Sequence, residues 1–596
     1  MQPKYSKLRA LGCRELIAID TEYVSRPGEH VVPVCVCAKS LFTGKTWRVW
    51  HRKGSKSPFK TNPEIVYIAY SATAEWSYFL SCGWGLPRSI IDLYPERSLE
   101  INGRKEPDGT RPSRKLLGAM EAHEIRTRDE VSKDLNIQLI LRGAPYTPQE
   151  QERILDYCEE DVEDTIRLFD AMLPSMDIER ALHRGDYTRP IAHIEHNGIP
   201  VDVKSIAKLR GNWPRIMSKL ASNVERAHHY GVYDLTGDKP RFSMKGFEAL
   251  LDRMGILDEW PKTGTDDEPG QPIVADGRGK DGEVFKDMCG RYPELEPLRV
   301  LRGMFVDMKE FKLPIGKDGR ARTFPFPWAS VTGRNQPGRG FIYGQAKWTR
   351  FLMKPAPGRA IAYLDLKSAE FGIAGALSGD KNMMTAYRSD DDVYLATAKL
   401  TGAVPGSATK QSHAAIRSTY KVVTLGMQYG MSAWGLQSKL GITVPEAQRL
   451  IEAIHRVYRT YFHWIDDLVP TSQALGKIEA PMGWAMHVDD ETNPRTLKNF
   501  PMQTTCGEIL RIAVDMMLDH GIMLCATVHD AVLIESSARN IARDCQIAAE
   551  CWATASKVVL DGFELKSDCV ITKYPRRYFE EDGKEMWDRV RELIAA

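Results

Sequence analysis

The chain has 596 residues, a length that predicts about three or four domains of ordinary size. Hydrophobic residues make up 43% and charged residues 27%, and 81 lysines and arginines nearly balance 79 aspartates and glutamates. This balance argues against a basic nucleic-acid coat protein and an acidic disordered chain. No apolar run reaches the ~18 residues of a membrane span, and we expect no secretory signal at the start of the chain.

The eleven cysteines predict a reducing compartment. They are dispersed from Cys13 to Cys569, and no two of them form a CxxC pair. This spacing disfavours both a disulfide framework and a zinc site. We therefore expect a cytosolic protein.

The first 185 residues or so predict an α/β domain with candidate metal ligands. Strand-like apolar runs occur at 15–20, 31–38, 46–53 and 65–70, and a helical pattern runs from 148 to 173. Asp20 and Glu22 end the first strand and share one face, because side chains alternate along a strand.

Tyr157 and Asp161 lie one helical turn apart within the pattern at 148–173. Three carboxylates on a strand and a helix can hold two divalent metal ions about 4 Å apart and activate a water at a phosphodiester. The tyrosine can orient that water. Taken alone, Asp20 and Glu22 are equally compatible with solvated acids in a turn.

The last 270 residues or so contain a second set of candidate residues. Strand patterns at 360–371 and 523–536 contain Asp365 and Asp530, and helical patterns at 414–425 and 444–462 lie between them. Two such carboxylates suffice to hold two Mg²⁺ ions for nucleotidyl transfer.

A helical stripe links these two aspartates in sequence. Arg417 and Lys421 lie one turn apart and can grip triphosphate oxygens, and Leu425 and Tyr429 continue the stripe with surface for a base. The alternative for the isolated segment is an amphipathic helix with two exposed basic residues.

The order of these residues resembles two known enzyme families. The pair DxE and YxxxD is similar to the DEDD-type 3′–5′ proofreading exonucleases, in their tyrosine variant. Asp365, then R-x3-K-x7-YG from Arg417, then the pair His529 and Asp530 resemble motifs A, B and C of the family A, polymerase I-like DNA polymerases. Three further segments of the chain also resemble segments of that family, at 194–202, 331–337 and 495–503.

The resemblance extends from about residue 10 to the C-terminus and implies an α/β multidomain fold. The chain resembles most the compact bacteriophage members of the family, in which a 5′-nuclease domain is absent. An RNase H-like exonuclease domain (1–185) would precede a right-hand polymerase. That polymerase would comprise a thumb with its connecting segment (186–330), and a palm with an antiparallel sheet and helical fingers (331–596, fingers about 380–497).

The resemblance also implies a role for each matching residue. Catalysis would use Asp365, Asp530, Lys421 as proton donor to pyrophosphate, and Tyr157. The incoming nucleotide would contact Arg417, Lys421, Leu425, Tyr429, Leu366 through its carbonyl, and Glu370 as the gate against a ribose 2′-OH. Primer and template would contact Arg334, His529, Arg495, Asn499 and Gln503. Metal ions would bind Asp365 and Asp530 in the polymerase site, and Asp20, Glu22 and Asp161 in the exonuclease site.

The sequence departs from these families at several positions. The second exonuclease motif normally supplies an aspartate, but the best local match, at 72–80, has Ser77 at that position. The nearest acid is Glu75, so either the metal site is rebuilt around Glu75 or the exonuclease is weakened. Leu425 replaces an aromatic residue, and Ala531 replaces the acid that usually follows the motif C aspartate.

We therefore expect a template-directed DNA polymerase with a 3′–5′ proofreading exonuclease, used for phage genome replication. Each active site would use two Mg²⁺ or Mn²⁺ ions. The partners would be primer–template DNA, dNTPs and phage replication proteins such as a helicase and a single-strand binding protein. We expect a monomer without a membrane partner, in the cytoplasm of the infected bacterial cell.

Other functions stay open at this point. The same enzyme could have a weakened exonuclease, or be specialised for a modified nucleotide such as 2-aminoadenine triphosphate. A nuclease whose C-terminal half only holds DNA is opposed by the intact Asp365, Lys421 and Asp530. A non-catalytic DNA-binding replication scaffold would predict lost metal ligands, and only the second exonuclease motif has such a loss.

Overall fold

The structure is a computed structural model that describes residues 3–127, 130–264, 269–275, 284–309, 313–389, 391–428 and 430–595. Backbone contacts divide the chain into two compact units. The first unit contains residues 1–198, 324–338 and 358–571. The second contains residues 199–323, 339–357 and 572–596. Among the described residues, no helix combines the length and the apolar character needed to cross a bilayer.

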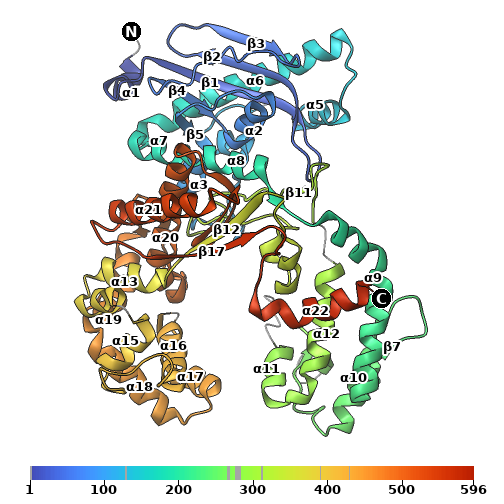
Figure 1. The fold of residues 1–596 in the computed structure, drawn as a ribbon. Helices are drawn as coiled ribbons and strands as arrows, with labels where there is room; N and C mark the ends of the chain where they lie inside the picture. The colour runs from blue at the N-terminus through green and yellow to red at the C-terminus, as the bar shows by residue number, and fades with distance from the viewer. Residues whose placement is uncertain are drawn as a thin grey trace. The chain divides into compact units, whose positions relative to one another are not determined.

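A five-stranded mixed sheet in the order β3-β2-β1-β4-β5 forms the core of the N-terminal part of the first unit (Figure 1). Its strands are β1 (Glu15–Val24), β2 (Val32–Ser40), β3 (Thr46–Trp50), β4 (Ile65–Ala69) and β5 (Ser89–Asp92). β1 pairs antiparallel with β2 and parallel with β4, so it is the central strand that its apolar run predicts.

Helices cover both faces of this sheet. The helices of this N-terminal part are α1 (Ser6–Ala10), α2 (Thr73–Cys82), α3 (Leu93–Glu100), α4 (Leu116–Ala122), α5 (Glu130–Arg142), α6 (Pro148–Met172), α7 (Ile178–Asp186) and α8 (Thr188–Asn197). Leu16 and Ala18 of β1 pack in one core with α6, while Ile17 and Ile19 pack in another with α2. The alternation places the even-numbered residues of β1, among them Asp20 and Glu22, on the α6 side.

The long helix α6 starts where the sequence predicts. Thr147 caps it and forms a capping box with Glu150, and Pro148 occupies its first turn. These local signals fix the helix start and therefore the rotation at which Tyr157 and Asp161 face β1.

A buried ion pair joins two helices of this N-terminal part. Arg184 on α7 donates two hydrogen bonds to Glu96 on α3, at 2.6 and 2.7 Å, and each side chain is only 5% exposed. Removing one partner of such a pair leaves an uncompensated buried charge.

We therefore expect Glu96→Ala to lower the free energy of unfolding by about 3–5 kcal/mol, as measured by urea denaturation. Glu491→Ala removes one partner of the exposed pair Lys105–Glu491 and should cost no more than about 1 kcal/mol. Equal losses in the two variants would contradict this account of the buried pair.

The second half of the first unit is built on the antiparallel sheet β15-β16-β12-β17. Its strands are β12 (Arg359–Leu366), β15 (Met523–Val528), β16 (Ala531–Ser537) and β17 (Ser567–Lys573). The long helices α20 (Pro494–Asp519) and α21 (Ile541–Val559) contact each other and these strands. The antiparallel pairing of β12 and β15 with β16 agrees with the predicted palm sheet.

In the described part of the segment between β12 and α20, seven helices and a hairpin occur. They are α13 (Ala369–Ser378), α14 (Lys381–Arg388), α15 (Val393–Leu400), α16 (Ala414–Gln428), α17 (Ala433–Leu440), α18 (Val444–Val457), α19 (Arg459–Leu475), β13 (Lys477–Glu479) and β14 (Ala485–His487). Most of this segment lies within the range 380–497 for which helical fingers are expected, and that assignment stays a prediction.

The second unit consists of helices with short strand pairs. Its main elements are β6 (Ile199–Pro200), α9 (Val203–His228), β7 (Tyr233–Asp234), β8 (Arg241–Phe242), α10 (Met244–Arg253), β9 (Lys262–Gly264), β10 (Pro269–Pro272), α11 (Val284–Arg291), α12 (Glu296–Lys309), β11 (Arg320–Ala321), η5 (Lys347–Leu352) and α22 (Glu581–Ala595).

The contact division differs from the predicted boundaries at 185 and 330. The C-terminal segment belongs to the second unit because Trp587 stacks on Phe351, with ring centroids 5.6 Å apart, and Arg577 pairs with Asp202. At the other boundary, Asn197 of α8 donates to the Leu524 carbonyl of β15 at 2.8 Å. Residues 186–198 therefore belong with the first unit rather than with the predicted thumb.

Candidate active sites

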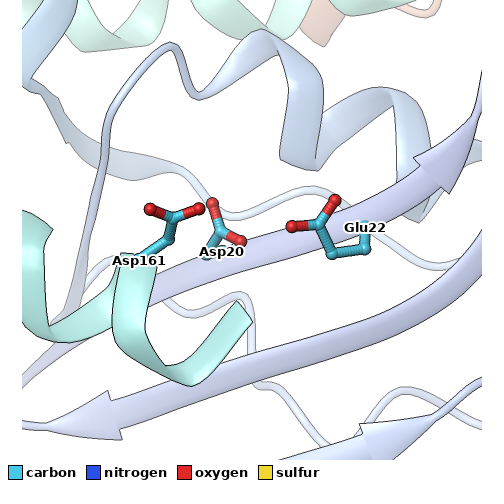
Figure 2. A group of neighbouring side chains, drawn as sticks. All are labelled: Asp20, Glu22 and Asp161. Atoms are coloured by element: carbon cyan, nitrogen blue, oxygen red, sulfur yellow. The ribbon is translucent and has the colours of Figure 1, made fainter. Parts of the chain in front are cut away.

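Three carboxylates meet between β1 and α6. One ligand atom from each of Asp20, Glu22 and Asp161 lies within 4.8 Å of the others. Figure 2 shows Asp20 between the other two, with Asp161 reaching the strand from the helix. The three residues that the sequence predicted to converge therefore do so.

The electrostatics of this cluster favour a bound cation. Burial raises the pKa of Glu22 well above its usual range, and the negative charges of Asp20 and Asp161 raise it further. Oxygen ligands of this kind are those that Mg²⁺ and Mn²⁺ prefer. The all-carboxylate donor set therefore fits a divalent metal ion.

Two more side chains surround this carboxylate cluster. Burial and the charge of Asp161 raise the pKa of Tyr157, which keeps its hydroxyl protonated at neutral pH. Lys133 on α5 places its Nζ 3.4 Å from Asp161 Oδ1. No spacing in the sequence pointed to Lys133, because α5 and α6 are brought together only by the fold.

The structure separates the two candidates for the second exonuclease motif. Glu75 in the first turn of α2 is 2% exposed, and its Oε2 accepts no hydrogen bond from the described residues. Burial and the charge of Asp20 raise its pKa well above the usual range. Ser77, two residues later, donates to Glu195 of α8 at 3.2 Å. Glu75, and not Ser77, is therefore the side chain coupled to the carboxylate cluster.

The two C-terminal aspartates lie at one end of the palm sheet. Asp365 near the end of β12 pairs with Ala531 at the start of β16, and the turn between β15 and β16 carries Asp530. The Leu366 amide donates to the Asp530 carbonyl at 3.2 Å. His529 in this turn has a φ of 52°, a left-handed conformation that histidine tolerates better than most residues.

A cavity of about 430 Å³ surrounds these aspartates. It is lined by Arg334, Asp365, Leu366, Ser368, Ala369, Glu370, Phe371, Tyr394, Leu425, Gln503, His529 and Asp530. Eight of these residues belong to the predicted polymerase set, although they come from segments nearly 200 residues apart. Predicted catalytic, nucleotide-binding and primer-binding residues thus share one concave site.

Burial gives the two aspartates of this cavity an affinity for positive charge. It raises the pKa of Asp365 to about 7, and the charges of Asp530 and Asp568 contribute to the rise. Burial also raises the pKa of Asp530. Because both donors are carboxylates, this site too fits a hard divalent cation.

Arg334 orients the residue predicted to exclude ribose. Its Nε donates to the Gln503 carbonyl at 3.0 Å, and its Nη2 lies 3.6 Å from Glu370 Oε1. Glu370 is thereby held at the cavity wall, beside Leu425. This arrangement is compatible with a contact to the sugar of a nucleotide.

The remaining predicted residues lie around the cavity or beyond it. Arg417 on α16 forms an ion pair with Asp392 and lies 5.9 Å from the ring of Tyr394, a cavity residue. Lys421, one turn further along α16, is exposed. On α20, Arg495 is exposed and Asn499 half-buried, at intervals of four residues from Gln503. Tyr429 lies outside the described residues.

Comparison with known proteins bears directly on this half of the chain. Residues 343–571 match the family model described as DNA polymerase family A. This segment is therefore similar to the polymerase domain of that family. It contains both cavity aspartates and the whole of α16.

Curated DNA polymerases I are similar to a large part of this chain. The thermostable enzyme of Thermus aquaticus is 24% identical over 403 residues, which cover 62% of this chain and 44% of that protein. The enzyme of Pseudomonas aeruginosa is 26% identical, covering 64% and 43%. That of Aquifex aeolicus is 24% identical, covering 69% and 68%. The chain thus spans less than half the length of most of these relatives.

A solved structure has the same fold over nearly the whole chain. It is the POL domain of Pol1 from M. smegmatis in complex with DNA primer-template and dNTP. The TM-score is 0.64 at 18% identity, and the match covers 98% of each chain. The chain therefore has the α/β fold of a DNA polymerase POL domain.

Proposed function

We propose that the chain is a template-directed DNA polymerase that also carries a 3′–5′ exonuclease. The observation that carries the polymerase proposal is the cavity within the segment that matches the family A model. It brings Asp365 and Asp530 together with Glu370 and Leu425. Two acids that can hold metal ions are what two-metal nucleotidyl transfer uses, and Glu370 and Leu425 would contact the sugar of the nucleotide.

Each side chain around the cavity would have its own role in the polymerase reaction. Asp365 and Asp530 would hold Mg²⁺ or Mn²⁺, and the bound ions would stabilise the negative charge of the phosphates. Arg417 and Lys421 would grip the triphosphate, and Lys421 would donate a proton to the leaving pyrophosphate. Release of Arg417 from Asp392 would accompany nucleotide binding. Arg334, Gln503 and His529 would position the primer end.

The N-terminal carboxylate cluster supports the exonuclease proposal. Asp20, Glu22 and Asp161 would hold the divalent ions, and Glu75 would complete the set. Tyr157 keeps its proton and would orient the attacking water by a hydrogen bond. The substrate would be the 3′ end of a DNA strand.

The contrast between Glu75 and Ser77 gives a prediction for the exonuclease. Glu75→Gln should slow the shortening of a 5′-labelled single strand in Mg²⁺ by about 10- to 100-fold, because it removes a charge from the ligand set. Ser77→Ala should change the rate less than about threefold, because its hydroxyl serves Glu195. A larger effect at Ser77 than at Glu75 would refute the assignment of the second motif.

A single-nucleotide assay tests the polymerase proposal. The protein is mixed with a 5′-labelled primer, a template with one defined next base, Mg²⁺ and one dNTP at a time. We expect the primer to gain one residue mainly with the complementary dNTP, for each of four templates. Equal addition of every dNTP, or no addition, would contradict template-directed synthesis.

The biological setting follows from the resemblance in the sequence. Replication of a phage genome, the replication proteins as partners and the host cytoplasm stay predictions. They go beyond the chemistry that the cavity and the carboxylate cluster support.

A further inference from the structure

An ion pair lies close to Asp365, between the end of β12 and the edge strand β17. Lys367 follows β12 directly, two residues after Asp365, and its Nζ lies 2.7 Å from Asp568 Oδ1 on β17. The Lys367 amide donates to the Lys566 carbonyl at 2.8 Å, which fixes the start of β17 beside the end of β12. The backbone therefore holds Asp568 and Asp365 on neighbouring strands with Lys367 at their junction.

Asp568 is within electrostatic reach of the cavity. Burial is the main cause that raises the pKa of Asp365, and the charges of Asp530 and Asp568 add to it. Because Lys367 follows Asp365 by two residues and pairs with Asp568 on the neighbouring strand, the two carboxylates flank the residue that carries the ammonium group. A lysine side chain is long and flexible enough to change partner between close carboxylates.

Stability does not account for this pair. The side chains of Lys367 and Asp568 are 46% and 67% exposed. Ion pairs at such exposure contribute little to folding, because water and salt screen them. We therefore expect the Lys367–Asp568 pair to act mainly through its electrostatic effect on the nearby Asp365 carboxylate.

We propose that Asp568 is a positioning residue that retains the Lys367 ammonium on the β17 side, so that the Asp365 carboxylate stays available to a divalent cation. The proposal rests on the polymerase function proposed for the cavity. Without Asp568, the ammonium turns to Asp365 and competes with the metal ion. The cation occupancy of the site is then set by a residue that does not itself bind the ion.

Binding of Mn²⁺, followed by electron paramagnetic resonance on the full chain, tests the proposal. The parent protein carries Asp20→Ala and Asp161→Ala, so that the exonuclease cluster does not contribute. Asp568→Asn in this parent should weaken Mn²⁺ binding roughly five- to tenfold, the size expected for one competing charge near the surface. Adding Lys367→Ala should bring the affinity back to within about twofold of the parent.

The matched control is Glu564→Gln, which removes one carboxylate from the exposed pair Lys557–Glu564 and makes the same change in net charge. It should leave Mn²⁺ binding unchanged. Unaltered binding in Asp568→Asn, or weakened binding that Lys367→Ala does not restore, would overturn the inference. If the parent itself neither binds Mn²⁺ nor extends a primer, the proposed function fails instead, so the two failures are distinguishable.

Discussion

Replacing Asp365 by asparagine is expected to reduce primer extension by about 10³-fold or more, while the shortening of the primer continues. The substitution would remove a carboxylate from the polymerase metal site only. A bound metal ion stabilises the transition state by several kcal/mol, and each 1.36 kcal/mol of barrier height changes the rate about tenfold. The measurement is the rate of extension of a 5′-labelled primer at saturating Mg²⁺ and dNTP. Extension within about tenfold of the wild type would contradict the assignment of Asp365.

The same variant should fold at least as stably as the wild type. In the metal-free protein the pKa of Asp365 is about 7, against an unfolded value near 3.8, so the folded state binds more protons between these pH values. The stability contributed by Asp365 is therefore present at low pH and lost as pH rises through about 7. At pH 8 the asparagine variant avoids the buried charge, and its melting temperature in a chelator should be equal or higher.

Replacing Asp20 by alanine is expected to reduce the shortening of the primer by about 10³-fold or more and to leave extension unchanged. Asp20 lies in the centre of the N-terminal cluster, with Glu22 and Asp161 on either side (Figure 2). Its removal opens the ligand set that would hold the exonuclease metal ions. The measurement is degradation of a 5′-labelled single strand in Mg²⁺ without dNTPs.

Asp156→Asn is the matched control for the Asp20 variant. Asp156 is an exposed acid on α6, and it pairs with Arg48 at 2.9 Å, outside the carboxylate cluster. Its replacement should change the exonuclease rate less than about twofold. Equal loss in the two variants would mean that general acidity, and not the cluster, supports degradation. Loss of extension in Asp20→Ala would mean that the two sites are not independent.

Local periodicity was enough to predict that the carboxylates of β1 and α6 converge. Alternation along β1 places Asp20 and Glu22 on one face, and the cap at Thr147 sets the rotation of α6 that brings Asp161 to them. Both signals lie within a few residues of the side chains that they orient. The fold then had only to bring one strand and one helix together.

The sequence left two candidates for the second motif, Ser77 at the aspartate position of the match and Glu75 two residues earlier. On a helix, a shift of two residues turns a side chain by about 200°, to nearly the opposite face. The Ser77 hydroxyl accordingly donates to Glu195 on α8, whereas the charge of Asp20 raises the pKa of Glu75. A match based on residue spacing alone cannot distinguish these directions, because the start of α2 depends on the end of β4.

Two features that the sequence did not predict involve contacts between residues far apart in the chain. The helical pattern at 444–462 is divided between α18 and α19 at Tyr458, whose hydroxyl lies 2.7 Å from Thr397 Oγ1. Likewise, contact of Trp587 with Phe351 assigns the C-terminal helix to the second unit. Both contacts join residues more than 60 positions apart, so no local pattern contains them.

The most direct test of two opposing activities in one chain is a single time course of primer length. Wild-type protein, a 5′-labelled primer–template and Mg²⁺ are incubated without dNTPs, and all four dNTPs are added after partial shortening. We predict that the primer first shortens from its 3′ end and then, on addition of dNTPs, grows to the end of the template. A primer that does not grow after dNTP addition would contradict the central claim, and one that never shortens would remove the exonuclease from it.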